Sequence, residues 1–193
     1  MNQENLPEIE DEPSSGALAP EARARMEAAA PLLHNGTFTV SHEKRGHFTV
    51  KVATAQKGEL AGKRIIYLLT GPDNVGDYRG VAFWIEDELD SRTGKPWPKA
   101  VIWKKYRGSD SRLPLDGYHY QRRVGWSSYE QKIAIFLDLA LRELGKEKVW
   151  PAASHFAAEG YKIERSSRCV RCNRVLTHPE SLKLGVGPEC AGK

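Results

Sequence analysis

The sequence contains few cysteines and lacks any long apolar run. Its three cysteines all lie within residues 169–193 of a 193-residue chain, too few for a disulfide scaffold and better suited to a reducing compartment. No run approaches the roughly 18 apolar residues of a membrane-spanning helix. The first residues combine neither a basic start nor an apolar stretch, so we expect no secretory signal. These absences predict a cytoplasmic protein without a membrane partner.

Charge is nearly balanced overall but unevenly distributed. The formal net charge is only +4, and residues 4–12 carry five acidic side chains and no basic one. Residues 92–123 carry nine basic side chains against only Asp110 and Asp116. An acidic beginning followed by a basic remainder is typical of a protein that binds a polyanion. A lysine-rich solvated surface would give the same composition.

The order of sequence patterns predicts an α+β protein. Apolar residues make up 40% and charged residues 28% of the chain, which are values of a globular protein. The expected order is a small five-stranded antiparallel sheet or barrel, then two helices, then a small zinc-finger module. The predicted boundaries are a disordered acidic tail at 1–18, a helix at 19–33, the β-sheet domain at 36–126, a helical segment at 127–160 and the zinc-binding module at 161–193.

Period-two alternation, a continuous apolar run at 64–69 and turn residues locate the predicted strands. The five strands are expected at residues 37–40, 47–52, 64–69, 78–85 and 100–106. Two helices follow. Ser127 and Ser128 can cap the first, whose apolar side chains recur every three and four residues up to Leu144. The second, shorter helix is expected at 151–159.

The cysteine spacing predicts a structural zinc site. Cys169 and Cys172 form a Cys-x-x-Cys pair, which lets two thiolates bind one ion from a tight turn, and Cys190 returns after a short segment. A short helix at 179–184 should follow a capping box in which Thr177 is the cap, and Gly185 should end it. A redox pair is the alternative, but the thioredoxin-like context that such pairs need is absent.

The fourth zinc ligand is open at the level of sequence. His178 lies between the cysteines and is the predicted ligand. His155, an acidic side chain or solvent could take the position instead. An open position would allow catalysis, yet no acid pair or His-Glu motif accompanies the cysteines, and we therefore do not expect an enzyme.

The finger motif resembles a family of unknown function found in phages and actinobacteria. The resemblance rests on Cys169-x-x-Cys172-Asn-Arg-x-Leu-Thr-x-Pro-Glu-Ser-x-x-x-Gly-x-Gly-Pro-x-Cys190. Residues 68–78 and the strand that ends at 101–104 are similar to the sheet domain that often precedes this finger. The resemblance implies a zinc site and an association with DNA metabolism in phages or mobile elements. It implies no enzymatic activity.

Aromatic and basic residues alternate in a second constellation, which is typical of single-strand binding. We predict that nucleic acid, DNA more than RNA, contacts this constellation and the arginines around the cysteines. The predicted contact residues are Trp97, Lys99, Trp103, Lys104, Lys105, Arg107, Arg122, Arg123, Arg168, Arg171 and Arg174. For any single tryptophan, a place in the core is the simpler interpretation.

Two functions from different classes follow from these patterns. The first is a zinc-containing nucleic-acid-binding accessory protein, encoded by a phage or mobile element. The second is a phage-type inhibitor or adaptor that binds a host protein or nucleoprotein complex, with the acidic residues 1–18 engaging a basic site on that partner. A metal-dependent enzyme is the least favoured hypothesis.

Overall fold

The computed structural model describes residues 33–86, 98–108, 115–116, 125–143, 153–172 and 174–192. The chain divides into two compact units, residues 1–30 and 31–193. The predicted acidic tail and N-terminal helix lie outside the described residues, except for Leu33. All the described residues belong to the second unit. No helix in the described ranges is both long and apolar enough to cross a membrane.

One antiparallel sheet organises the fold, in the strand order β6-β5-β4-β3-β2-β1-β7. The α+β class is therefore confirmed, with an open sheet of seven strands in the described part of the chain where five were expected. Its strands are β1 (Gly36–His42), β2 (Gly46–Thr54), β3 (Arg64–Leu69), β4 (Tyr78–Ile85), β5 (Lys99–Ile102), β6 (Leu115–Asp116) and β7 (Tyr161–Arg165).

The two additional strands and one shortened strand differ from the sequence prediction. The prediction began the zinc module at residue 161, but β7 pairs with β1 as an edge strand. The sequence of β7 is rich in charged residues and does not look like a strand, because an edge strand needs no continuous apolar face. The strand expected at 100–106 ends at Ile102, and residues Lys104–Tyr106 form the 3-10 turn η1.

Two helices cover one face of the sheet. Helix α2 (Ser128–Arg142) begins with a capping box between Ser127 and Glu130, and helix α3 (His155–Ala158) begins at Ser154. The apolar stripe of α2 packs on the sheet; the ring of Phe136 is fully buried and lies 5.5 Å from that of Phe38. This hydrophobic core is what holds the sheet and α2 together.

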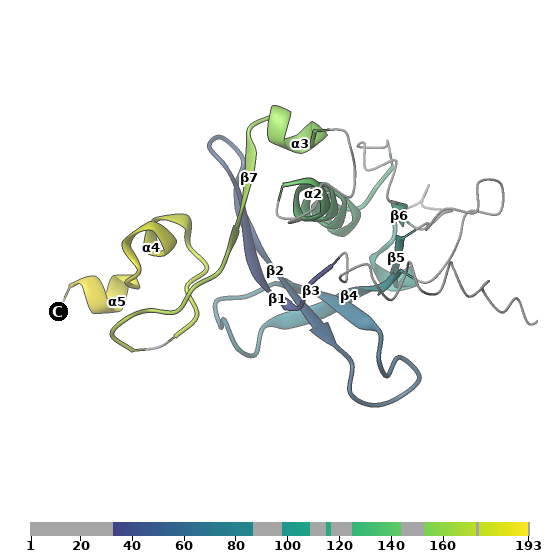
Figure 1. The fold of residues 1–193 in the computed structure, drawn as a ribbon, viewed down its shortest axis with the longest axis horizontal. Coiled ribbons are helices and arrows are strands. Elements are labelled where there is room, and N and C mark those ends of the chain that lie inside the picture. The colour runs from purple at the N-terminus through teal and green to yellow at the C-terminus, as the bar shows by residue number, and fades with distance from the viewer. Residues whose placement is uncertain are drawn as a thin grey trace, which may run out of the picture. The chain divides into compact units, whose positions relative to one another are not determined.

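Alternation along the strands gives the sheet an inner and an outer face. Inner residues such as Val50, Val52 and Ile66 belong to the core shared with α2. Thr39 and Thr49 are paired across β1 and β2 and point to the outer face, where both are buried. Figure 1 shows α2 and α3 on one side of β1 and β7, and the C-terminal segment on the other side.

The C-terminal segment, residues 166–192, is called the finger below. It contains the two short helices α4 (Pro179–Leu184) and α5 (Pro188–Ala191). The predicted helix 179–184 is confirmed, and Gly185 ends it with a φ of 67°, a left-handed conformation that suits glycine. The predicted cap is wrong: the N-cap of α4 is His178, which makes no side-chain capping bond. Thr177 instead contacts Asn74.

Candidate metal centre

A tight hairpin positions the first two cysteines. The backbone N–H of Leu176 donates to Ser167 O at 2.8 Å, and the N–H of Cys169 donates to Arg174 O at 2.8 Å. Because the hairpin closes immediately around them, Cys169 and Cys172 are held on one turn. The N–H of Val170 also donates to Gly185 O at 3.0 Å, which fastens this turn to the end of α4.

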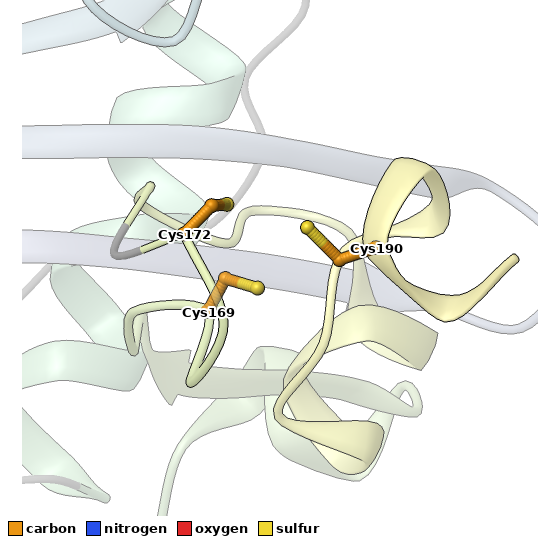
Figure 2. Close-up of side chains that lie close together, drawn as sticks. All are labelled: Cys169, Cys172 and Cys190. Atoms are coloured by element: carbon orange, nitrogen blue, oxygen red, sulfur yellow. The ribbon is translucent and has the colours of Figure 1, made fainter. Parts of the chain in front are cut away.

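Helix α5 brings the third cysteine to the same place. Gly187 and Pro188 turn the chain into α5, and the N–H of Cys190 donates to Gly187 O at 2.9 Å. The guanidinium of Arg171 donates to Cys190 O at 2.6 Å and ties the hairpin to α5. Figure 2 shows the three sulfur atoms facing a common space, two from the hairpin and one from α5.

The three sulfur atoms have the spacing of a metal site. Within the described ranges, Cys169, Cys172 and Cys190 form a group whose ligand atoms all lie within 4.8 Å of one another. A tetrahedral zinc–thiolate site with bonds of about 2.3 Å places its sulfurs about 3.8 Å apart. Small movements of the side chains would bring the sulfurs to this spacing, so the three cysteines can supply three ligands to a metal ion.

The environment of the sulfurs favours charge on one of them and opposes it on another. Backbone N–H groups of Gly187, Cys172 and Arg171 lower the pKa of Cys169 to about 6, so this thiol is largely a thiolate at neutral pH. The pKa of Cys190 is raised to about 11 by its side-chain hydrogen bond with Cys172, then by burial and by the neighbouring Cys169. Three adjacent thiolates repel one another, and a bound cation is what would let all three ionise.

His178 lies apart from the cysteine group. Its exposed ring meets that of His47 on β2 edge to face, with the centroids 5.0 Å apart. At the N-cap of α4 the backbone is extended, with a φ of −84° and a ψ of 131°. The cysteine group in the described residues does not include His178. The alternative ligand His155 lies on α3, where it pairs with Glu159 at 3.1 Å.

Hydrogen bonds attach the finger to the outer face of the sheet. Thr39 Oγ1 on β1 donates to Thr177 O at 2.9 Å, and Asn74 Nδ2 in the β3–β4 loop donates to Val175 O at 3.3 Å. Between the finger and the sheet lies a cleft of about 1040 Å³, which the three cysteines line together with Lys51, Tyr78 and Arg174. The cysteine group thus lies in one wall of a cleft whose other wall is the sheet.

The structure brings together only some of the residues predicted to contact nucleic acid. Lys104 and Lys105 are exposed on η1, directly after Trp103. Trp103 is half-buried: a Cβ on Gly80 would lie 2.7 Å from its ring. Lys99 is half-buried on β5, and Arg107 donates to Ile102 O at 2.6 Å, which gives it a structural contact. The expected alternation through residues 103–106 fails because the strand has ended.

The arginines predicted on the finger differ in their surroundings. Arg171 is occupied in the bond to Cys190 O, whereas Arg174 forms an exposed ion pair with Glu189 at 2.9 Å. Arg168 lines the cleft. The predicted contacts Trp97, Arg122 and Arg123 lie outside the described residues.

Sequence reasoning missed three residues of the cleft. Lys51 and Tyr78 reach it from the sheet, and Asn74 connects its two walls. Lys51 alternates with the buried Val50 and Val52, and this pattern could have placed Lys51 on the outer face of the sheet. The contact of Asn74 joins residues 101 positions apart, and no local pattern indicates it.

Comparison with known proteins gives one result for this segment. No curated protein and no solved structure matches the chain. The finger and part of β7, residues 163–193, match a family of unknown function (DUF6011).

Proposed function

We propose that this protein is a zinc-containing, nucleic-acid-binding accessory protein. Zinc is the metal that prefers a compact thiolate set of this kind in a small structural module. The observation that carries the proposal is the cleft, in which the cysteine-held finger and Lys51 of the sheet face each other with Arg168 and Arg174. The phage or mobile-element origin that the sequence resemblance implies stays a prediction.

Rigidity and charge support this function. A metal-held hairpin presents arginines at small entropic cost, and a guanidinium matches a phosphate in geometry. The pair between Arg174 and Glu189 joins side chains that are 74% and 78% exposed, so it is worth little and can open for a phosphate. Lys104 and Lys105 add exposed positive charge on the same polypeptide.

Fluorescence anisotropy over a salt series tests the proposal. Zinc-loaded protein is titrated into labelled single- and double-stranded DNA and RNA oligonucleotides. We expect binding whose logarithmic affinity falls linearly with logarithmic salt concentration. Replacing Arg174→Gln or Lys105→Gln should reduce that slope by about 0.7 to 0.9 for each phosphate that the variant no longer neutralises.

The control and the contradicting result follow from the fold. Lys132→Gln removes the same charge from the exposed surface of α2, on the helix-covered side of the sheet, and should leave the slope unchanged. Absence of binding to every oligonucleotide, or affinity that does not respond to salt, would reject the proposed function.

A second function is favoured by apolar exposure on the finger. Val170 and Leu184 are 79% and 71% exposed, and both flank Gly185. Apolar side chains on a rigid metal module suit a protein partner better than a polyanion, which agrees with the inhibitor or adaptor hypothesis. If Val170→Ser and Leu184→Ser abolish a nuclease-resistant complex and spare oligonucleotide binding, the finger serves this second function.

A further inference from the structure

The outer face of the sheet carries a row of aromatic rings that neither the core nor the finger covers completely. Tyr67 on β3, Tyr78 and Phe83 on β4, and Trp103 after β5 are all half-buried. The strands β3 and β4, which carry three of these rings, lie between β5 and β2 in the sheet order. We propose that this outer face binds a single strand of nucleic acid, with bases stacked on these rings. This inference rests on the proposed function and assigns it a site and a ligand class.

Strand register places the members of the row on one face. Lys51 is directly opposite Tyr67, and Tyr78 is opposite Leu69, two residues along β3. Thr37, which lines the cleft, is opposite Lys51. Because side chains alternate between faces, these residues share the face opposite the core. The bulge between Ile66 and Tyr67 keeps Tyr67 opposite Gly80.

Trp103 is a fixed ring at the far side of this face. Gly80 has no side chain, and Trp103 occupies the space that a Cβ would need. The N–H of Trp103 donates to Val81 O at 3.0 Å, which extends the ladder of β4 by one bond. Ile65 is only 4% exposed, although it lies outside the core shared with α2. Its side chain lies beside Gly80, where the ring of Trp103 also packs. A ring held in this way needs no ordering when a base stacks on it.

Positive charge follows the same row. The exposed Lys51 places its Nζ 5.3 Å from the centre of the Tyr78 ring. Lys104 and Lys105 are exposed next to Trp103, and the cleft continues from Lys51 to Arg168 and Arg174. Two acids line the same cleft: Asp73 accepts from the N–H groups of Val75 and Gly76, and Glu189 forms the exposed pair with Arg174 that a phosphate can replace.

Proteins bind single strands of nucleic acid with aromatic rings that are interleaved with lysine and arginine side chains. The bases of a duplex are stacked on each other and cannot reach rings on a sheet face, whereas those of a single strand can. A lysine between two tyrosines can contact the phosphate that links two stacked nucleotides. The row therefore selects a single strand over a duplex of the same sequence.

Matched substitutions on the two sides of the sheet test the inference. Tyr67→Leu removes a ring from the outer face, and Lys51→Glu reverses a charge there. Their controls are Tyr129→Leu and Lys132→Glu, which make the same changes at a half-buried tyrosine and an exposed lysine of α2. With a 12-nucleotide oligo(dT) probe, each outer-face variant should bind about tenfold more weakly than wild type. Each control should stay within about twofold.

Photocross-linking gives a second readout that does not depend on variants. Oligonucleotides carrying 5-iodouracil are irradiated with the zinc-loaded wild-type protein, and cross-linked peptides are identified by mass spectrometry. We expect cross-links at Tyr67, Tyr78 or Trp103. Thermal unfolding of each variant shows that weaker binding does not come from an unfolded protein.

The outcomes separate this inference from the proposed function. If Tyr67→Leu and Lys51→Glu still bind and the cross-links lie elsewhere, the outer face is not the binding site, and the proposal of nucleic-acid binding stands. Equal or tighter binding to duplex overturns the choice of a single strand. Failure to bind any oligonucleotide overturns both proposals, and a protein ligand that the two outer-face variants fail to bind would then assign the face to protein binding.

Discussion

The finger and the sheet-and-helix core are stabilised in different ways. In the core, the described strands and α2 bury a continuous set of large apolar side chains, among them Val40, Ile66, Phe136 and Leu137. Among the described finger residues 166–192, the buried side chains are only Cys169, Leu176 and Ser181. Hydrophobic burial can hold the first region, but the second has too few apolar contacts to fold by itself.

The contrast shows why the cysteines gather in one region. Segments below about 40 residues usually need a metal, disulfides or a partner to fold. Metal binding can supply on the order of 10 kcal/mol to such a module at neutral pH. If the finger binds the proposed metal, its folding depends on that binding free energy, while the core depends on hydrophobic burial. The two regions should then respond differently to the same perturbations.

Removal of the metal is expected to have the largest effect. Chelation, or Cys172→Ser, should unfold the finger because two thiolates cannot hold it, while the core keeps its native state. Elemental analysis should give one zinc per wild-type chain and much less in the variant. Amide hydrogen exchange should show that residues 166–192 lose protection while β2, β3 and α2 retain it.

A substitution in the same turn provides the control for that experiment. Val170 is 79% exposed between the two cysteines, so Val170→Ser should retain the metal and the protection. A finger that stays protected after complete metal removal would contradict the contrast between the two regions.

Truncation of a core side chain should lower the stability of the core and leave metal binding by the finger unchanged. Phe136→Ala removes a fully buried ring that packs against Phe38 and should lower the free energy of unfolding by about 3 to 5 kcal/mol. Urea denaturation measures this decrease, and a zinc competition assay should find the metal affinity unchanged. Leu184→Ala, at a 71% exposed position of the finger, should change the unfolding free energy by less than about 0.5 kcal/mol. A much weaker metal affinity in Phe136→Ala would show that the regions are not independent.

The smallest effect concerns the contact between the regions at His47 and His178. Partial burial, and then the neighbouring His178, lower the pKa of His47 below 6.5. The folded state therefore binds this proton less readily than the unfolded state, so protonation opposes folding as pH falls below about 6.5 and has no effect above it. In an NMR titration, His178→Gln should raise the pKa of His47 towards its ordinary value. The matched control is His34→Gln, at an exposed histidine outside this contact.

The same titration examines His178 as a ligand. If His178 coordinated the metal, its ring would not titrate in the zinc-loaded protein near neutral pH. Ordinary titration of His178, together with tight zinc binding in His178→Gln, would leave the three cysteines and a ligand of another kind.

Much of the local structure could be predicted from the sequence. Alternation located β1 and β2, a continuous apolar run located β3, Ser127 and Ser128 marked the start of α2, and Gly185 marked the end of α4. Each of these signals acts over a few residues, through side-chain period or backbone conformation. The cysteine spacing indicated the metal site for the same reason, because the hairpin and α5 are themselves local structures.

Contacts across the chain could not be predicted in the same way. The charged sequence of β7 gives no sign that it pairs with β1, and no residue near His178 in the sequence indicates its contact with His47. Tyr67 lies in a run that reads as uniformly apolar, so its place on the outer face depends on register with β2 and β4. Register is fixed by the whole sheet rather than by one strand.

The sequence by itself determined that this protein has an antiparallel sheet, a capped helix after it and a C-terminal module with three cysteines. Those features follow from backbone preferences and from the short spacing between the cysteines. Only the tertiary structure decided that the finger lies on the sheet face opposite α2, and that a cleft and a row of half-buried rings lie on that face. The reason is that such surfaces are assembled from residues far apart in the chain, as in the bond from Thr39 to Thr177 across 138 positions.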